Sequence, residues 1–252
     1  MTIARRTFLR RAAVVTGTAV AGALPFSQYL ASPAYAAQGW IEPKLIRDAA
    51  RRARARRKAV STDVPSRNGW EMEKATDQGG SIRTRPVPGT PISGVAVRIG
   101  EVETVLVHLI RRFHYEVDSL RKGDVTGWRS PGQVRKGLAE GNQASGTAVQ
   151  IRPGHYPHGV TGGFFPNQEL VIRDILAELD GVVRWGGDDA KADESLFYID
   201  VRPDSRHLTQ VAHKLQGWSE KPGKGAGGQI DITSPHRRAA ARSRFLQQRT
   251  TT

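Results

Sequence analysis

The sequence predicts an α+β fold in which a small antiparallel sheet packs against two main helices. Two stretches, residues 103–118 and 166–179, repeat apolar side chains at helical spacing, as helices that cover a sheet do. Five shorter runs have the apolar content of strands and are separated by turn-forming residues: 80–87, 94–99, 147–152, 182–185 and 196–201. All these segments fall within residues 65–218, which we therefore interpret as one domain.

The first predicted helix has a wide apolar face. Its apolar side chains recur every three or four residues: Val105, Leu106, Leu109, Ile110, Phe113 and Val117. His108 and His114 lie on the same helix, where we expect structural roles for them. The second helix begins at Pro166, a favoured first helical residue, and ends before Asp180. Residues 207–215 are predicted to form a last short helix.

A tight turn around Gly146 precedes the strand at 147–152. Small residues surround the glycine, and apolar and polar positions alternate after it. This pattern predicts a half-buried strand that follows directly from the turn.

The turn and the strand read Gln143-Ala144-Ser145-Gly146-Thr147-Ala148-Val149-Gln150. This stretch resembles the signature of the zinc D-Ala-D-Ala carboxypeptidase/dipeptidase family, His-x-x-Gly-x-Ala-x-Asp, in which the His and the Asp bind zinc. Gly146 and Ala148 keep the frame of the motif. Gln143 and Gln150 stand at the two ligand positions.

A second stretch carries the resemblance further. The family's third zinc ligand is a His in a Glu/Asp-x-x-His-Phe-Glu run that follows a Trp-Gly-Gly-Asp turn. Here the turn is Trp185-Gly186-Gly187-Asp188, and Leu196 stands at the His position. Asp193 stands where the family keeps its acid/base carboxylate. The resemblance implies the hedgehog/D,D-peptidase fold for residues 65–218, with all three zinc ligands replaced.

The replaced ligands predict a domain without zinc. A catalytic zinc needs three imidazole, carboxylate or thiolate ligands and an open position for water. Neutral amides bind zinc poorly, and leucine has no donor atom. Without the metal no bound water is acidified, so Asp193 has no activated water to work on. We expect a catalytically inactive domain with no cofactor.

Such a domain is expected to bind a peptide without cutting it. The residues predicted to contact the ligand are Arg129, Gln143, Ser145, Gln150 and Asp193. Arg129 lies where the resembled family places an Arg that steadies a substrate carbonyl or carboxylate, and Arg135 is a second candidate. Glutamine both donates and accepts hydrogen bonds, which suits a peptide backbone. The implied partner is a peptidoglycan stem peptide or a cell-wall protein.

Two other hypotheses are open at this point. His155 and His158 lie three residues apart and, together with Asp188, Asp189 or Asp193, make a workable ligand set for a relocated zinc site in an active peptidase. Alternatively, the domain is a structural carrier, and its basic flanks bind an anionic wall polymer or lipid. Nucleic acid is not an expected partner, because the chain is predicted to be exported.

The flanks of the domain differ from it in charge and composition. Residues 1–36 have a twin-arginine run, an apolar stretch and a small-x-small site at Ala34-Tyr35-Ala36, which predict export through the twin-arginine pathway to the cell wall or beyond. An uncleaved membrane anchor is the alternative. Residues 37–64 predict a basic helix and linker, with a polar joint at 61–66, and residues 219–252 a basic disordered tail.

The placement of charge separates the domain from its flanks. The formal net charge is +14, yet residues 65–218 hold nineteen basic and nineteen acidic residues, so the domain is neutral. The chain contains no cysteine, which excludes disulfides and a lipid-anchored cysteine. Stability must therefore come from the packed core.

Overall fold

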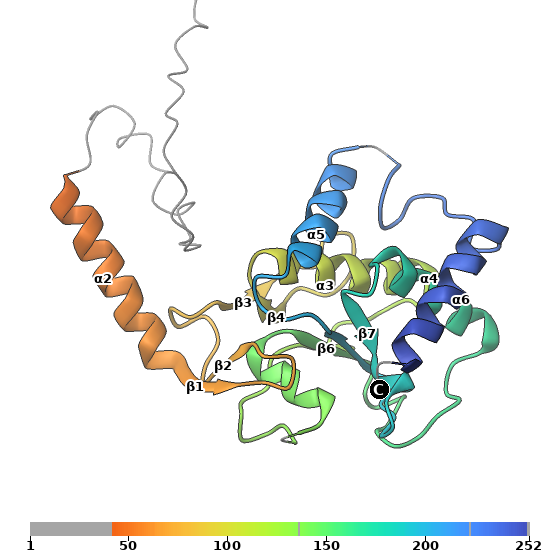
Figure 1. Cartoon of the computed structure of the whole chain (residues 1–252), viewed down its shortest axis with the longest axis horizontal. Helices are drawn as coiled ribbons and strands as arrows, with labels where there is room; N and C mark the ends of the chain where they lie inside the picture. The colour runs from red at the N-terminus through yellow and green to blue at the C-terminus, as the bar shows by residue number, and fades with distance from the viewer. Residues whose placement is uncertain (1–41, 136, 222, 251–252) are drawn as a thin grey trace, which may run out of the picture. The chain divides into compact units, whose positions relative to one another are not determined.

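The computed structural model of the chain describes residues 42–135, 137–221 and 223–250 (Figure 1). The chain divides into two compact units, Met1–Asp48 and Ala49–Thr252, and the fold below is that of the second unit. The predicted export signal, residues 1–36, lies outside the described residues. Within the described ranges, no helix combines the length and the apolar character that a membrane span requires.

The central element is a four-stranded antiparallel sheet with the order β5-β6-β8-β7. Its strands are β5 (Val125–Thr126), β6 (Ala148–Ile151), β7 (Val183–Trp185) and β8 (Leu196–Ile199). The register pairs Val149 of β6 with Phe197 of β8, and Trp185 of β7 with the same Phe197. Together with the helices, this sheet confirms the predicted α+β class.

Three helices lie beside this sheet: α3 (Glu101–Arg112), α4 (Pro166–Glu178) and α5 (Arg206–Ser219) (Figure 1). The first predicted helix is shorter than expected, because α3 gives way at Phe113 to a π-helical turn that runs to Val117. The turn ends where the backbone of Asp118 becomes extended while its N–H donates to the carbonyl oxygen of Phe113 at 3.0 Å. The other two helices match their predicted positions within a few residues.

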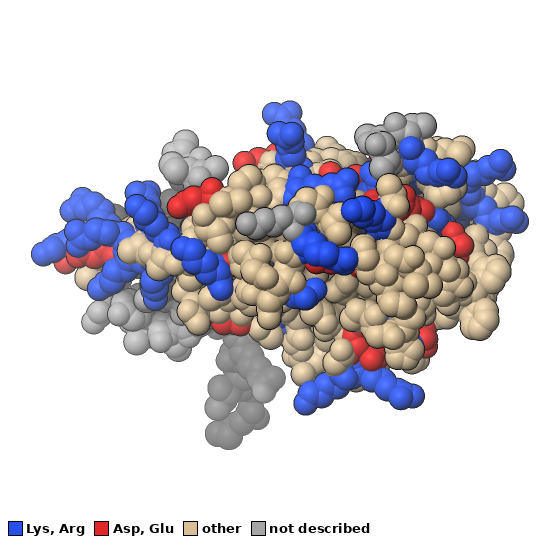
Figure 2. Space-filling view, turned by 90° about the horizontal axis from the view of Figure 1, so that it is seen from below, with Lys and Arg blue, Asp and Glu red and all other residues tan. Residues whose placement is uncertain are grey.

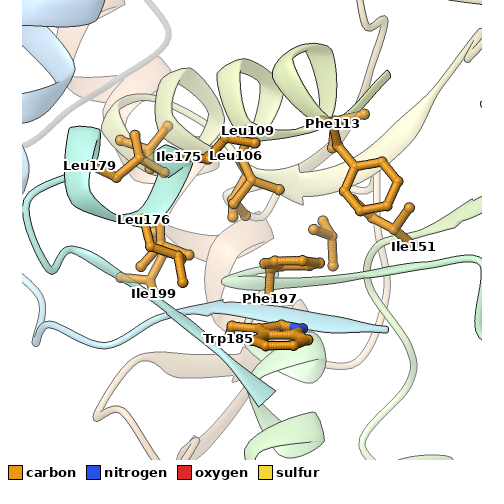
Figure 3. Close-up of a cluster of buried hydrophobic side chains, with 14 of the residues drawn as sticks. Leu106, Leu109, Phe113, Ile151, Ile175, Leu176, Leu179, Trp185, Phe197 and Ile199 are labelled. Atoms are coloured by element: carbon orange, nitrogen blue, oxygen red, sulfur yellow. The ribbon is translucent and has the colours of Figure 1, made fainter. Parts of the chain in front are cut away.

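The main core lies between these helices and one face of the sheet. Figure 3 shows Leu106 and Leu109 of α3 and Leu176 of α4 on the side of the core nearest the helices. Phe197 lies beneath them and stacks on Trp185, with ring centroids 6.5 Å apart. Burial of such apolar surface is the main source of stability in a chain without disulfides.

Strand β6 is fully buried, so the expectation of a half-buried strand is wrong. Val149 and Ile151 pack into the main core. On the opposite face, Ala148 packs in a smaller apolar cluster with Ala139, from the 3-10 helix Ala139–Ser145. The strand is therefore covered on both faces, which its alternating sequence does not indicate.

Two smaller antiparallel pairs complete the strands. β3 (Ile82–Arg85) and β4 (Val95–Arg98) lie within the runs predicted as strands at 80–87 and 94–99, and they pair with each other. β1 (Ser61–Pro65) pairs with β2 (Glu71–Glu73), which corrects the expectation of an irregular joint at 61–66. The glycine of the predicted turn is also explained: Gly146 has a φ of +68°, and a Cβ there would lie 2.8 Å from the backbone nitrogen of Arg98.

The predicted disordered tail contains a helix, α6 (Pro235–Thr250), which packs against α4. Arg237 donates to Asp174 of α4 at 2.7 and 2.6 Å, and Arg244 pairs with Asp180. The guanidinium of Arg173 lies 4.2 Å from the ring centroid of Phe245. The prediction is wrong because α6 is held by ion pairs, by the contact between Phe245 and Arg173, and by a hydrogen bond from Gln248 to the Val183 carbonyl oxygen, which a search for apolar periodicity does not detect.

A buried ionic cluster joins α3, α4 and α6. Arg112, with no exposed surface, pairs with Asp174 at 2.9 Å and with Glu178 at 3.3 Å. His108 lies 2.8 Å from Glu178, which also accepts from Arg237 at 3.2 Å. Burial alone would raise the pKa of Glu178, but the hydrogen bond with His108 and the charge of Arg112 lower it to about 2. His108 thus has the structural role that the sequence suggested.

Candidate functional site

Two of the three positions that align with the zinc ligands, Gln150 and Leu196, come together at the β6–β8 pair. Gln150 of β6 and Leu196 of β8 are direct partners in the register, so their side chains lie on the same face of the sheet. Asp193 lies three residues before Leu196, in the turn that links β7 to β8. This arrangement is the centre of the candidate site.

Asp193 is held in place by several bonds. Its side chain is 2% exposed, and its Oδ1 accepts from the Ser195 hydroxyl at 2.6 Å. Its Oδ2 accepts from Nε2 of Gln150 at 3.0 Å and lies 3.7 Å from Nδ1 of His158. A Cβ at Gly186 would come within 2.6 Å of the Asp193 carbonyl oxygen, so the glycine of the Trp-Gly-Gly-Asp turn allows this close approach.

Asp193 lines a cavity of about 230 Å³, which we call the first cavity. Apolar groups from Leu138, Ala139, Ala190 and Leu196 form much of its wall. The polar side chains that line it are Arg67, Glu140, His158, Asp189, Lys191 and Asp193. The cavity therefore combines a small apolar chamber with one anchored carboxylate and several charged groups.

Gln143 lies apart from the first cavity. Its side chain has no exposed surface, and its Nε2 donates to the carbonyl oxygen of Gly127 at 2.9 Å. Its Oε1 has no hydrogen-bond partner among the described residues. The predicted contact between Gln143 and a ligand therefore has no support in its placement.

Ser145 also belongs to the interior. Its hydroxyl accepts from Ser66 at 2.9 Å and donates to the carbonyl oxygen of Asn142 at 2.9 Å. It lies 2.8 Å from the hydroxyl of Thr147, and its side chain has no exposed surface. The structure thus places Ser145 in a buried polar network rather than in a cavity.

The two predicted arginines, Arg129 and Arg135, both act on the carboxylate of Glu140. Nε of Arg135 donates to this carboxylate at 2.8 Å. Burial raises the pKa of Glu140, but its bonds with Arg135 outweigh burial and hold that pKa below its usual range. The charge of Arg129 acts in the same direction. Arg129 and Arg135 therefore offset the negative charge of Glu140, which lines the first cavity, and neither arginine lines the cavity itself.

The residues present do not fit a zinc ion. At the motif positions, Gln150 directs N–H donors toward Asp193, Gln143 is turned to a backbone carbonyl, and Leu196 offers no donor atom. In the described part of the chain, no group of three or more His, Asp or Glu side chains is placed to hold a metal ion. His158 lies beside Asp193, whereas the charge of His155 acts on Asp124. The two histidines of the relocated-site hypothesis are thus directed to different carboxylates.

Sequence reasoning missed Arg67, Glu140 and the pair formed by Tyr198 and Asp189. The Tyr198 hydroxyl donates to Asp189 at 2.9 Å. Burial raises the pKa of Asp189, against this hydrogen bond and the charge of Arg184. Tyr198 stands where the family motif has its final Glu, which was a signal that the position faces the site. Arg67 gave no signal, because it comes from a turn far away in the sequence.

Comparison with known proteins adds no relative to this description. No protein-family model matches the chain, and neither a curated protein nor a solved structure matches it.

Proposed function

We propose that residues 65–218 form a hedgehog/D,D-peptidase-like domain that binds a short peptide in the first cavity and does not cut it. The family resemblance rests on the motif around Gly146 and on the Trp-Gly-Gly-Asp turn. Both motifs border one face of the β6–β8 pair, which supports reading them as a single site. The resemblance suggests a peptidoglycan stem peptide as the ligand. Export by the twin-arginine pathway, inferred from residues 1–36, would bring the domain to that ligand.

One observation carries this proposal: the anchored carboxylate of Asp193 at a small cavity with an apolar wall. A volume of about 230 Å³ lies just below the usual range for ligand pockets, about 300–1,000 Å³. It suits one or two residues with methyl side chains, such as D-alanine. Asp193 accepts a peptide N–H, and the cationic Arg67 and Lys191 suit a terminal carboxylate.

Titration calorimetry on the full chain tests the proposal, with N-acetyl-L-Lys-D-Ala-D-Ala as the probe. We expect measurable binding and no release of D-alanine. Asp193→Asn keeps the shape of the side chain and removes its charge. Since a hydrogen bond to a charged group is worth about 1.5–3 kcal/mol, this variant should bind about 10- to 100-fold more weakly.

The control is Asp204→Asn, which changes an exposed carboxylate outside the first cavity and should leave binding unchanged. Absence of binding to the unmodified chain would contradict the proposal. Release of D-alanine would show that the chain is an enzyme and would contradict it equally.

Helix α2 (Pro43–Val60) favours a second role, the retention of the chain at an anionic polymer. Among its residues only Val60 is buried. From Ala49 to Lys58 the helix has six basic residues and no acidic residue, and Figure 2 shows Lys and Arg side chains crowded over it. Such a density of exposed positive charge binds anions without a shaped cavity.

A further inference from the structure

A second cavity, of about 440 Å³, lies next to the first. Arg67 lines both cavities, and the hydrogen bond from Tyr198 to Asp189 joins a residue of the second cavity to a residue of the first. The second cavity is therefore an extension of the candidate site, although no motif residue except Tyr198 lies in it.

The wall that presents Arg67 is held rigidly. The turn after β1 is fixed on both sides of Arg67 by bonds to distant parts of the chain. Ser66 donates to the buried Ser145 at 2.9 Å, and Asn68 donates from Nδ2 to the Ile199 carbonyl oxygen at 2.8 Å. The buried hydroxyl network of Ser145 thus serves to position the turn, and the turn positions Arg67. Such preorganisation lowers the entropic cost of binding.

Two arginines that line the second cavity, Arg67 and Arg202, are available to a ligand. Asp200 lies 3.7 Å from Arg184, which offsets its charge. Within the described ranges, neither Arg67 nor Arg202 has a carboxylate within 4.0 Å. Asn142 forms part of the wall, is fully buried, and has an Nδ2 without a hydrogen-bond partner among those residues. Two cations and a free amide donor together suit an acceptor group with negative charge.

We propose that the second cavity binds a carboxylate of the same peptide, upstream of the end held in the first cavity. Arg202 is its charge partner there, and Arg67, at the junction, contacts the peptide in both cavities. This inference rests on the proposed function, since it names a further chemical feature of that ligand. It makes the site specific for a peptide with an internal acidic residue.

Two synthetic peptides separate this inference from the proposed function. N-acetyl-Glu-Lys-D-Ala-D-Ala and N-acetyl-Gln-Lys-D-Ala-D-Ala differ only in one carboxylate, which is a carboxamide in the second. Calorimetry on the full chain should show the Glu peptide binding about tenfold more tightly, as a charge-assisted bond does. Arg202→Gln should abolish this preference and leave the affinity for the Gln peptide unchanged.

Arg206→Gln is the matched control, because it removes an exposed arginine near Arg202 that lines neither cavity. If this control loses the preference to the same extent, general charge explains the result and the inference is wrong. If both peptides bind the unmodified chain equally, the inference is wrong and the proposed function stands. If neither peptide binds, both are wrong.

Discussion

Gln150 and Leu196 face each other across β6 and β8, at two positions where the resembled family has zinc ligands. The amide of Gln150 donates to Asp193, so it neutralises part of the electrostatic cost of keeping that carboxylate buried. On the proposed relationship to the zinc peptidases, a hydrogen-bonded carboxylate stands beside the positions where that family has a metal centre.

Restoring the ligands tests whether the three positions converge. We expect the triple variant Gln143→His/Gln150→Asp/Leu196→His to retain about one zinc per chain, because two imidazoles and a carboxylate form a complete set. The unmodified chain should retain almost none. Mass spectrometry of both proteins, after zinc loading and dialysis, measures the difference.

The double variant Gln143→His/Gln150→Asp is the control for this experiment, since two ligands hold zinc much more weakly than three. Tight zinc binding by the unmodified chain would contradict the proposed function. A triple variant without zinc would show that Gln143, which now faces Gly127, does not reach the other two positions.

The placement of a residue was predictable where a motif specifies both the position and the direction of its side chain. Asp193 and Gln150 are of this kind, and the structure brings them to one hydrogen bond. Ser145 is of the other kind. Its neighbour Ser66 is 79 residues away, so the network that buries its hydroxyl is invisible to local patterns. Arg67 was missed for the same reason, because the residues that position its turn are far away in the sequence.

At the scale of elements, the cluster around Glu178 links three helices through charges rather than apolar contacts. Removing one partner of a buried ion pair costs about 3–5 kcal/mol, because the other charge is left unpaired. We therefore expect the docking of α6 on α4 to depend on whether these carboxylates are ionised.

The pKa of Glu178 gives this dependence a direction. Its folded value of about 2 lies below its ordinary value of 4.5, so the ionised group stabilises the fold at pH values above 4.5. That contribution, on the order of 3 kcal/mol, should disappear as the pH falls from 4.5 toward 2. Urea unfolding at a series of pH values measures this loss.

Glu178→Gln should lower stability at neutral pH and flatten the pH dependence in the same window. The exposed Glu220→Gln serves as the control and should keep the dependence of the unmodified chain. An unchanged slope in Glu178→Gln would assign the loss of stability to other carboxylates.

Elements were predictable where their apolar pattern reflects the core they face. The stripe of α3 and the strands β6, β7 and β8 were located correctly because their partners are apolar, whereas the two-residue strand β5 was missed. Helix α6 was not, since its partners are Asp174, Asp180 and the ring-facing Arg173 of a distant helix. The full burial of β6 was missed because Ala139, which covers one face, belongs to a 3-10 helix that was not predicted.

At the scale of the whole molecule, the positive charge that an anionic ligand can reach is unevenly distributed. Two arginines of α6 are paired: Arg237 with Asp174 of α4, and Arg244 with Asp180, which follows α4. Helix α2 has basic residues along its exposed surface, and one of them, Arg57, pairs with Glu71 at 3.2 Å. Retention by an anionic polymer should therefore depend on α2 more than on α6.

Two variants with equal loss of charge test this expectation. Arg52→Gln/Arg54→Gln removes two cations from α2, and Arg237→Gln/Arg244→Gln removes the two cations of α6 that pair with Asp174 and Asp180. Glutamine preserves helix propensity in both. In co-sedimentation with purified teichoic acid at low salt, the α2 variant should be retained several-fold less than the α6 variant. Equal losses would mean that only net charge matters.

High salt provides the second test of the α2 role. At about 1 M salt the Debye length falls to about 3 Å, so retention of the unmodified chain should disappear. Binding that persists there would indicate contacts other than charge.

The ionic cluster also has a consequence for the order in which the protein assembles. Asp174 and Glu178 are synthesised well before Arg237, which follows Glu178 by 59 residues. Before α6 is made, Arg112 and His108 already contact these carboxylates, and Arg237 of α6 adds a second guanidinium to them. We therefore expect α3 and α4 to pack together first and α6 to dock on them afterwards.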